Sequence, residues 1–537
     1  MREIKFIYFD GEKSYLTWCK FGYIVAALKK IKNTRVEVID INYSNIKEKC
    51  TNINAGGSSI IFMAVKYGTY AIAQEMLELL DNSHHISWCH TLPTEYPQKV
   101  LEENKKIDSV IVGEEDYSVI ELCERINSNE TLEGCKGVVY KENGKVIHNG
   151  SRELIKNIDI LPFPDRASFP HDKRFFHVLG SRGCMGNCSF CNMNSKYKSE
   201  KGQRFRTIES VMAEIDILVE KYNCKYIGFS DSTFCASKKQ KCDISRLTEL
   251  YTALKKRTYK IKFFINLRSE QIDEESIKCI DKLNDVGLCN VFVGLESWLE
   301  KDLRLYNKIA KKEDNVRAVN IINDYCKKRN KKNILNFEYG FINFNPYSTI
   351  EGVKENITLL KKFGINITPK ILLSRVALYH NTGIVQEASK TGIELESVNL
   401  YKKEIGYKFC DKKVEQLYSI LEYQVKMLEV FNDENFPILY NIYLETYGID
   451  ETADKVMDAF NRFYNMQSQY LLHVFFSDLG EKIYENAIDI DDVKKVYIPT
   501  RQSTLHGVLV HDFRRYSARF PVISACGLFR YRYSGFC

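Results

Sequence analysis

Two series of alternating strands and helices run through this chain, and they limit the folds open to it. In the first series, apolar runs at 4–9, 36–41, 59–65, 86–90 and 109–113 predict strands, and helical periodicity fills 15–31, 68–81, 94–104 and 115–127. Strands that alternate with helices form a parallel sheet covered on both faces. Residues 138–150 then read VVYKENGKVIHNG, a hairpin with Asn143-Gly144 as its turn. We therefore expect a doubly wound, Rossmann-like α/β domain over residues 1–160.

A proline-rich stretch separates the two series. Residues 161–170, LPFPDRASFP, hold three of the ten prolines in the chain. Proline fixes φ and removes a hydrogen-bond donor, so residues 161–174 are expected to be an extended linker.

The second series runs on a larger scale. Its predicted strands are 176–180, 225–230, 262–267, 290–295, 333–341 and 370–378, and its predicted helices are 207–222, 243–256, 273–286, 312–328 and 350–364. Six such units fit a partial (β/α)6 barrel of the TIM type over residues 175–400. In these barrels the chemistry lies at the carboxyl ends of the strands.

Beyond residue 400 the strand pattern fades, and 401–537 are expected to form a mainly helical extension with helices at 412–431 and 451–472. Its tail is basic and aromatic and ends CGLFRYRYSGFC. Such a tail either packs over the barrel or stacks on nucleic acid. The net charge of only +7 favours packing. Cys526 and Cys537 allow a metal site, but their spacing alone is weak evidence.

Composition excludes several classes of protein. The chain is 44% apolar and 27% charged, which is typical of a globular protein and not of a disordered one. Its apolar runs are too short for a membrane span, and the first ten residues read as a strand and not as a signal peptide. We therefore expect a cytoplasmic protein, in which the 17 cysteines do not indicate a disulfide framework.

Three cysteines stand together. Residues 180–191 read GSRGCMGNCSFC and place Cys184, Cys188 and Cys191 directly after a predicted strand. Thiolates at this spacing can wrap one soft metal centre, with Gly183 and Gly186 allowing the tight path of the backbone. An electron-transfer [4Fe-4S] cluster normally has four cysteine ligands, so three would leave one iron open. A zinc knuckle with His177 or another cysteine as fourth ligand is the alternative.

The motif resembles that of the radical S-adenosylmethionine (SAM) enzymes, C-x3-C-x2-C with an aromatic residue before the third cysteine, here Phe190. In that family the three cysteines hold a [4Fe-4S] cluster, and the open iron binds the amino and carboxylate groups of SAM. Reduction cleaves SAM to methionine and a 5'-deoxyadenosyl radical, which abstracts hydrogen from a substrate. The resemblance implies that Cys184, Cys188 and Cys191 are the cluster ligands.

The resemblance also implies a set of SAM contacts. GFSDSTF at 228–234 offers Asp231 to the amino group of SAM, although this side chain would also suit a cap or a turn. NLRSEQID at 266–273 places Arg268 at the barrel mouth, either with the SAM carboxylate or in a rim ion pair. VGLES at 293–297 offers Glu296 and Ser297 to the ribose and methionyl groups, and Phe190 would pack by the adenine. Asn307-Lys308 follows, as in the family, and LYHNTGI at 378–384 has Gly383 where the family usually has proline.

The N-terminal domain resembles the cobalamin-binding domain that precedes the barrel in one radical SAM subfamily. The matching features are VGEED at 112–116, the hairpin and the proline-rich linker. Two features of cobalamin binding are missing: residues 9–23, FDGEKSYLTWCKFGY, contain no histidine, and Ser87-Trp88 stand where a glycine pair usually lets the backbone approach the cofactor. The resemblance therefore leaves two possibilities open, bound cobalamin or a domain kept as a scaffold.

The predicted function is that of a radical SAM enzyme acting on a small-molecule, natural-product or peptide substrate. A low-potential donor such as flavodoxin or ferredoxin would reduce it, in an anaerobic or protected cytosol. A cobalamin-dependent C-methyltransferase is one alternative. A tRNA methylthiotransferase, with Cys19, Cys50 and Cys89 as auxiliary ligands, is another, although their surroundings match poorly. A non-catalytic iron–sulfur or zinc protein is the alternative from another class.

Overall fold

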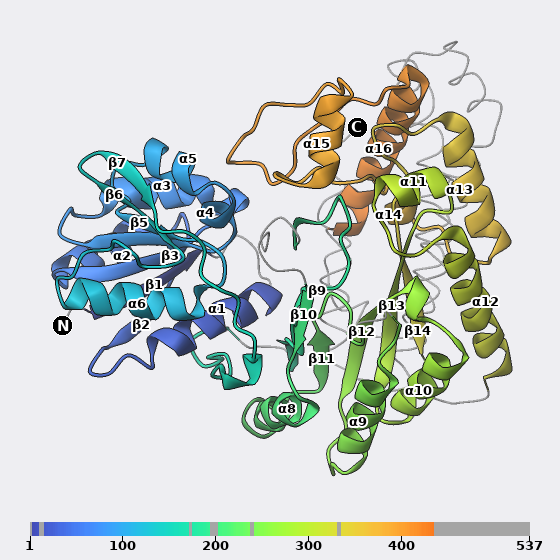
Figure 1. Ribbon diagram of the computed structural model, residues 1–537, viewed down its shortest axis with the longest axis horizontal. Coiled ribbons are helices and arrows are strands. Elements are labelled where there is room, and N and C mark those ends of the chain that lie inside the picture. Colours follow the sequence, from blue (N-terminus) through green and yellow to red (C-terminus); the bar gives the residue numbers. More distant parts are fainter. Residues whose placement is uncertain are drawn as a thin grey trace, which may run out of the picture. The chain divides into compact units, whose positions relative to one another are not determined.

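The computed structural model describes residues 3–9, 15–170, 174–193, 202–236, 241–329 and 335–433 (Figure 1). The predicted helix at 451–472, the basic tail, Cys526 and Cys537 lie outside these residues. The chain divides into two compact units. One comprises Met1–Pro346, Gly352–Ile365 and Ser374–Lys408, and the other comprises Tyr347–Glu351, Asn366–Leu373 and Phe409–Cys537. Both predicted α/β regions therefore belong mainly to the first unit, joined through the proline-rich linker, and the predicted division at 161–174 stays a prediction.

The N-terminal region is a seven-stranded sheet of order β2-β1-β3-β4-β5-β6-β7. Strands β1 to β5 pair in parallel, and β6 and β7 form the expected antiparallel hairpin. The strands are β1 (Glu3–Phe9), β2 (Val36–Ile41), β3 (Ser59–Ala64), β4 (His85–Cys89), β5 (Ser109–Ile111), β6 (Val138–Glu142) and β7 (Lys145–His148). The main helices are α1 (Tyr15–Leu28), α2 (Ile46–Ala55), α3 (Tyr70–Leu79), α4 (Thr91–Glu95), α5 (Pro97–Glu103) and α6 (Glu115–Asn127).

Burial explains why these runs form a parallel sheet. Every residue of β3 is buried, as expected for a strand covered by helices on both faces. Alternate residues of β1 and β3 enter two separate apolar clusters, one with Ile7 and Ile61 and the other with Phe6 and Phe62. The prediction of a doubly wound α/β region is confirmed.

The second region contains a five-stranded parallel sheet of order β8-β11-β12-β13-β14, with α8, α9, α10 and α12 along it (Figure 1). Its strands are β8 (Phe175–Val178), β11 (Tyr226–Phe229), β12 (Lys262–Arg268), β13 (Leu288–Glu296) and β14 (Asn336–Phe341). The helices are α8 (Ile208–Tyr222), α9 (Ile244–Lys255), α10 (Glu274–Asp285), α11 (Glu300–Leu305), α12 (Lys312–Lys328), α13 (Ile350–Lys362), α14 (Pro369–Leu372), α15 (Gly383–Lys390) and α16 (Lys412–Asp433).

The sixth predicted strand, 370–378, is wrong in its extent. Residues Pro369–Leu372 form the short helix α14, and the remainder contributes a single parallel bridge between Phe344 and Arg375. Proline at the first position of a helix is favoured because its missing N–H needs no partner there. The run of apolar residues that follows it reads the same for a helical turn and for a strand. The α/β barrel class itself is confirmed.

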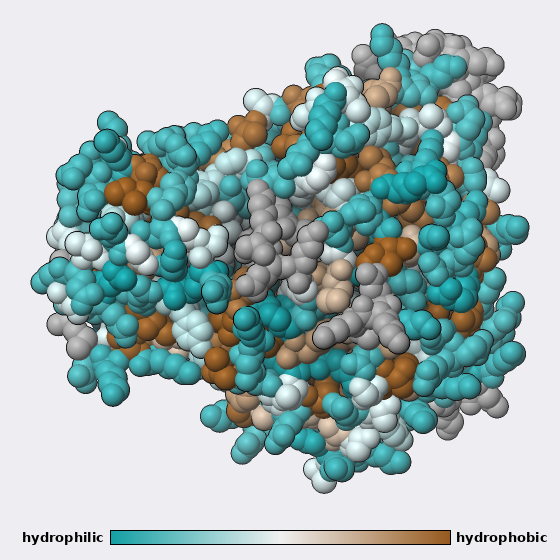
Figure 2. Space-filling model, in the orientation of Figure 1, coloured by the Kyte–Doolittle hydropathy of each residue, from teal (hydrophilic) through white to brown (hydrophobic). Residues whose placement is uncertain are grey.

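A two-stranded antiparallel hairpin, β9 (Ser181–Cys184) with β10 (Gly202–Phe205), stands apart from both larger sheets. It follows β8 directly and carries the first of the three clustered cysteines. Hydrophilic side chains cover most of the face of the molecule in Figure 2, with scattered hydrophobic patches.

Candidate active site

The three cysteines lie on one loop after β8. Cys184 ends β9, and Cys188 and Cys191 follow; all three are free, half-buried thiols. A Cβ atom built on Gly186 would lie 3.5 Å from the sulfur of Cys184 and 3.8 Å from that of Cys188. The backbone of Gly186 therefore lines the space beside these sulfur atoms. In the described ranges no three His, Cys, Asp or Glu side chains are placed to hold a single metal ion.

Gly183 allows the tight turn at which the cysteine loop leaves the hairpin. Gly183 has φ of +83°, a conformation that L side chains rarely adopt, and a Cβ on it would run into the carbonyl oxygen of Gly202 on β10. The cysteine loop therefore leaves the hairpin by a path that only glycine takes without strain.

Backbone contacts from the end of α11 hold the middle of the loop. The Ser189 N–H donates to the Tyr306 carbonyl at 2.9 Å, and its hydroxyl donates to the Leu305 carbonyl at 2.6 Å. Asn307 Nδ2 donates to the Asn187 carbonyl at 2.8 Å. Phe190 packs edge-on against Tyr306 with ring centroids 5.5 Å apart. The loop is thus fixed on both sides of Cys188.

Burial makes the thiols of Cys188 and Cys191 weaker acids. It raises the pKa of Cys188 to about 11, against the opposing charge of Lys308, and it also raises the pKa of Cys191. A thiolate is the form that ligates metal, and a bound cation favours it. Three free thiols on one glycine-lined loop have the donor chemistry that an iron–sulfur cluster needs.

Two ion pairs stand beside this loop at the carboxyl ends of β12 and β13. Lys308 Nζ lies 3.3 Å from Glu296 Oε1, and Arg268 pairs with Glu270. Burial would lower the pKa of Lys308, but the charges of Glu296, Cys188 and Glu270 raise it overall. Lys308 is therefore a buried cation next to the thiol of Cys188.

Arg268 has unused hydrogen-bonding capacity. The residue is 8% exposed; its Nη2 pairs with Glu270 Oε1, whereas its Nε and Nη1 have no partner among the described residues. The second carboxylate oxygen of Glu270, Oε2, also has none there. One guanidinium nitrogen lies 2.9 Å from the place a Cβ of Gly186 would take. Buried polar groups normally find partners, so these atoms indicate a polar ligand.

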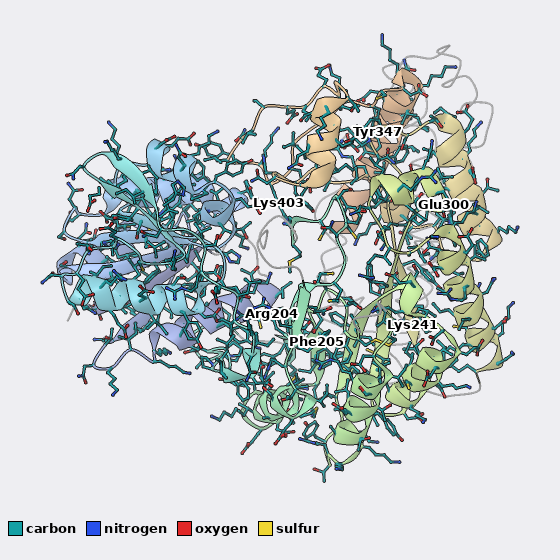
Figure 3. The ribbon with its side chains drawn as sticks, viewed as in Figure 1. Arg204, Phe205, Lys241, Glu300, Tyr347 and Lys403 are labelled. Carbon is teal, nitrogen blue, oxygen red and sulfur yellow. A yellow bond between two sulfur atoms is a disulfide. The ribbon has the colours of Figure 1, made fainter. Side chains whose placement is uncertain are left out.

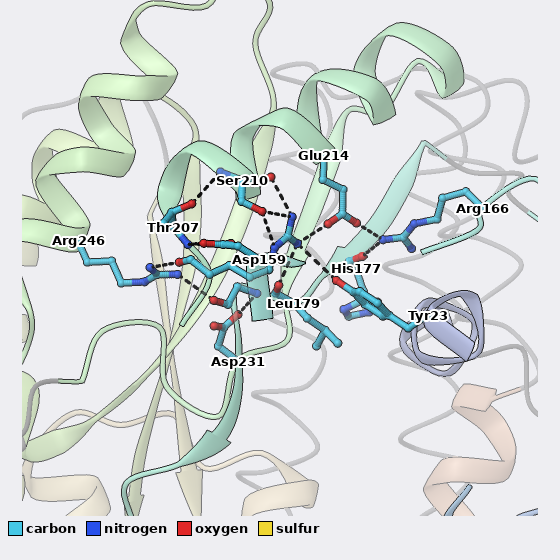
Figure 4. A network of polar contacts seen from close by, with 12 residues as sticks. Tyr23, Asp159, Arg166, His177, Leu179, Thr207, Ser210, Glu214, Asp231 and Arg246 are labelled. Atoms are coloured by element: carbon cyan, nitrogen blue, oxygen red, sulfur yellow. Dashed lines mark hydrogen bonds and ion pairs between the residues drawn. The ribbon is translucent and has the colours of Figure 1, made fainter. Parts of the chain in front are cut away.

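Asp231 is buried and already bound. Its carboxylate accepts from the Gly180 N–H at 3.0 Å and from the Ser181 hydroxyl. Burial raises its pKa to about 6, while Ser181 and Arg246 oppose this rise. Figure 4 shows Asp231 and Arg246 in the polar network around this turn. These contacts fix the turn between β8 and β9. The predicted contact of Asp231 with SAM stays a prediction, and the bonds it makes are those of a positioning residue.

The hydroxyl of Ser297 also has hydrogen-bond partners within the protein. Ser297 is fully buried, and its hydroxyl lies 2.9 Å from Asp302 Oδ2 and 3.3 Å from Asn356 Oδ1. Of the predicted contacts Phe190, Arg268, Glu296, Asp231 and Ser297, the first three adjoin the cysteine loop or its ion pairs. The sequence did not indicate a role for Lys308 or Glu270. The signals that could have found them are the family pattern that Lys308 follows and the position of Glu270 two residues after Arg268.

His177, the fourth ligand of the zinc alternative, points elsewhere. Its Nδ1 lies 2.6 Å from Ser230 Oγ, and its ring packs edge-on against Phe175 and Phe264. Cys19, Cys50 and Cys89, the auxiliary ligands of the methylthiotransferase alternative, are buried in three different apolar clusters.

The structure contains one feature that was not expected, a disulfide between Cys235 and Cys242. It closes the loop after β11. The Cys235 carbonyl also accepts a hydrogen bond from Gln271 Nε2 on the loop after β12.

The N-terminal sheet does not offer the features expected of a corrin site. Trp88 on β4 is fully buried, stands edge-on to Tyr70 and donates its indole N–H to the Met63 sulfur at 3.2 Å. The indole therefore fills space that a glycine pair would leave open beside the strand. Past β3 and β4, His380 stacks on Tyr67 at 5.5 Å and stands edge-on to Tyr96 at 5.1 Å. Trp88 thus occupies the place of the expected glycine pair, and cobalamin binding stays possible and untested by these contacts.

No helix in the described part of the chain is long and apolar enough to cross a membrane.

Comparison with known proteins gives one family match. The model of the radical SAM superfamily matches residues 178–375, which include the cysteine loop and strands β11 to β14. An uncharacterised methyltransferase of Pyrococcus horikoshii is 31% identical over 278 residues, covering 50% of this chain and 56% of that protein. The 4'-phospho-dehydrooxetanocin synthase of Priestia megaterium is 24% identical over 368 residues, 64% of this chain and 48% of that protein. The chain thus spans about half the length of these curated relatives.

Solved structures show the same fold. The cobalamin-dependent radical SAM enzyme OxsB, solved with aqua-cobalamin and SAM, has a TM-score of 0.70 at 18% identity, covering 96% of this chain and 84% of that chain. The radical SAM methyltransferase TsrM from Kitasatospora setae, solved with cobalamin and a [4Fe-4S] cluster, has a TM-score of 0.59 at 14% identity, covering 74% and 78%. The N-terminal sheet therefore has the fold found in cobalamin-dependent radical SAM enzymes.

Proposed function

Since this chain belongs to the radical SAM superfamily through residues 178–375, we propose that it cleaves SAM reductively and uses the 5'-deoxyadenosyl radical to abstract hydrogen from a substrate. The observation that carries the proposal is the placing of three free thiols on one loop beside two buried cations, Arg268 and Lys308. When bound, a [4Fe-4S] cluster supplies the electron for the cleavage, and its open iron supplies a site for SAM.

In this proposal Cys184, Cys188 and Cys191 hold the cluster. Arg268 has unpaired donors suited to the carboxylate of SAM, because a guanidinium forms strong charge-assisted bonds with carboxylates. The carboxylates of Glu270 and Glu296 are suited to bind the ammonium group of SAM. Phe190 stays available to pack on the adenine.

Asp231 and Ser297 support the site in a different way. Asp231 fixes Gly180 and Ser181 at the entry to the cysteine hairpin. Ser297 joins Asp302 and Asn356 in a buried network just after β13. Both side chains act by holding the strand ends from which the cluster and SAM residues project.

Methyl transfer is the second candidate. It is supported by the relative of Pyrococcus horikoshii named as a methyltransferase and by the shared fold with TsrM. The buried indole of Trp88, which stands where a glycine pair would be expected, weighs against the cobalamin-dependent form. We therefore place hydrogen abstraction first. The substrate would be a small molecule or a peptide, and the electron donor a low-potential carrier of the flavodoxin or ferredoxin type.

Product analysis separates the two candidates. The protein is reconstituted anaerobically with iron and sulfide and incubated with SAM and a strong reductant, with and without cobalamin. We expect 5'-deoxyadenosine in both cases, and none from Cys184→Ala. S-Adenosylhomocysteine that forms only with cobalamin would establish methyl transfer. An intact cluster that yields neither product would contradict both candidates and favour an electron carrier.

A further inference from the structure

We propose that Glu114 and Asp116, in the N-terminal sheet region, position the hairpin that carries the cluster ligand Cys184. This inference rests on the proposed function, because it assumes that Cys184 binds a cluster. It assigns to the N-terminal region a role in the radical SAM site that requires no cofactor of its own.

The first contact joins Asp116 to β9. Arg182 donates from Nη1 to Asp116 Oδ2 at 2.7 Å and from Nη2 to Asp116 Oδ1 at 3.0 Å. Both side chains are largely buried, at 14% and 5% exposure. A bidentate pair fixes orientation as well as distance. Arg182 stands two residues before Cys184 on the same four-residue strand.

The second contact joins Glu114 to β10. Arg204 donates to both oxygens of Glu114, at 3.0 and 2.7 Å, and to the carbonyl of Ile155 at 2.7 Å. Arg204 lies on β10 just before Phe205 (Figure 3). In the hairpin it is the direct partner of Arg182. Like charges opposite each other destabilise a strand pair, so this hairpin depends on the two carboxylates.

Besides the two arginine–carboxylate pairs, Gln203 Nε2 on β10 donates to the Thr233 carbonyl, and Arg246 lies over the Phe205 ring. The hairpin is a separate two-stranded sheet that makes no ladder with the five-stranded sheet or with the N-terminal sheet. Two-stranded hairpins are marginally stable on their own. Ser181, bound to Asp231, anchors one end. The two arginine–carboxylate pairs anchor the strands between that end and Cys184.

Helix α6 places both carboxylates at its N-terminal end, in reach of the two arginines. Glu114 is its N-cap residue and Asp116 lies in its first turn, where the helix dipole favours negative charge. Both residues are buried, at 6% and 3% exposure. Arg182 Nη1 also lies 3.6 Å from Glu114 Oε1, so removing either carboxylate leaves two neighbouring buried arginines with only one negative charge. The expected response is a shift of the hairpin, and with it of the Cys184 sulfur.

The test compares cluster retention in four variants of the full chain. Asp116→Asn and Glu114→Gln remove one charge each, and Arg182→Lys keeps the charge but loses the bidentate geometry. Glu121→Gln is the matched control, because Glu121 lies on the same helix and pairs with Arg125 and Arg152, away from the hairpin. After anaerobic reconstitution, iron loss to a chelator is timed, and the electron paramagnetic resonance spectrum of the reduced cluster is recorded with and without SAM.

We expect Asp116→Asn and Glu114→Gln to lose iron about tenfold faster than the wild type, because each leaves two buried arginines with one carboxylate between them. Their reduced clusters should also give altered g values and a smaller change on adding SAM. Arg182→Lys should show the same changes to a smaller degree, with the melting temperature kept. Wild-type spectra and iron loss in these variants, or equal effects in Glu121→Gln, would overturn the proposal. A wild-type chain that binds no cluster would instead overturn the proposed function.

Discussion

Lys308 Nζ lies 3.3 Å from Glu296 Oε1 where β13 ends, and the charges of both residues act on the thiol of Cys188. Lys308 is 4% exposed and its partner 16%. This buried ion pair provides both a donor and an acceptor for SAM beside Cys188, which we propose as a cluster ligand. The pair therefore gives the first prediction.

Lys308→Met should weaken SAM binding to the reconstituted protein by at least about tenfold, because truncating one partner of a buried charge pair leaves the other unpaired. The measurement is the SAM dissociation constant from the change in the cluster spectrum. Lys312→Met is the control, since Lys312 pairs with Glu355 at a site that is largely exposed. Equal affinities in the Lys308 variant and the wild type would show that the pair takes no part in SAM binding.

The cluster ligands should be separable from other cysteines of similar burial. Cys184→Ala, Cys188→Ala and Cys191→Ala should each bring the iron bound after reconstitution close to zero, because a cluster with only two thiolates is poorly held. Cys289→Ala is the matched control, as Cys289 is a half-buried free thiol on β13 whose S–H lies 3.3 Å from the Phe263 carbonyl. A full iron content in any of the three variants would contradict the assignment of that cysteine.

Gly186→Ala tests the space beside the sulfur atoms. The new methyl group would lie 2.9 Å from an Arg268 guanidinium nitrogen and 3.5 Å from the Cys184 sulfur. Arg268 must then move, and SAM binding should weaken several-fold while iron binding largely persists. Gly383→Ala is the control, because Gly383 begins α15 and faces the cysteine loop, where its methyl group would meet Ser189 at ordinary contact distances of 3.5 Å and more. If both variants bind SAM like the wild type, Arg268 is not held against Gly186.

Local patterns predicted the elements of this fold well. Helix α6 spans residues Glu115–Asn127 and strand β2 spans Val36–Ile41, as the apolar periodicity indicated. The cysteine loop was equally clear, because its spacing is itself the signal. The sixth strand was mispredicted because an apolar run after a proline fits a helical turn as well as a strand.

Contacts between distant residues could not be predicted. Ser297 is occupied by Asn356, 59 residues away, and Arg182 binds Asp116, 66 residues away. A single sequence contains no signal that shows which distant residues contact each other. Asp231 and Ser297 were reasonable candidates for SAM contacts because their side chains are polar. In the folded chain, however, both side chains are buried and already bonded to other residues.

The last prediction concerns the pH dependence of stability. His177 lies in the second region of the chain with its Nδ1 2.6 Å from Ser230 Oγ, and burial, with help from the charge of Arg166, lowers its pKa to about 4. Its unfolded pKa is about 6.5. The folded state therefore binds fewer protons than the unfolded state between these values. The stability due to neutral His177 is complete above pH of about 6.5 and is lost as the pH falls towards 4.

We expect the free energy of unfolding of the wild type to decrease, relative to that of His177→Asn, by about 2–3 kcal/mol between pH 6.5 and 4. Asparagine keeps a polar group near Ser230 and does not titrate. Urea unfolding at several pH values measures the difference, and comparing the two proteins cancels the opposing effect of Asp231, whose pKa is raised to about 6. His148→Asn, at an exposed position on β7, should follow the wild type. Parallel curves for the wild type and His177→Asn would mean that the pKa of His177 is the same in the folded and the unfolded protein.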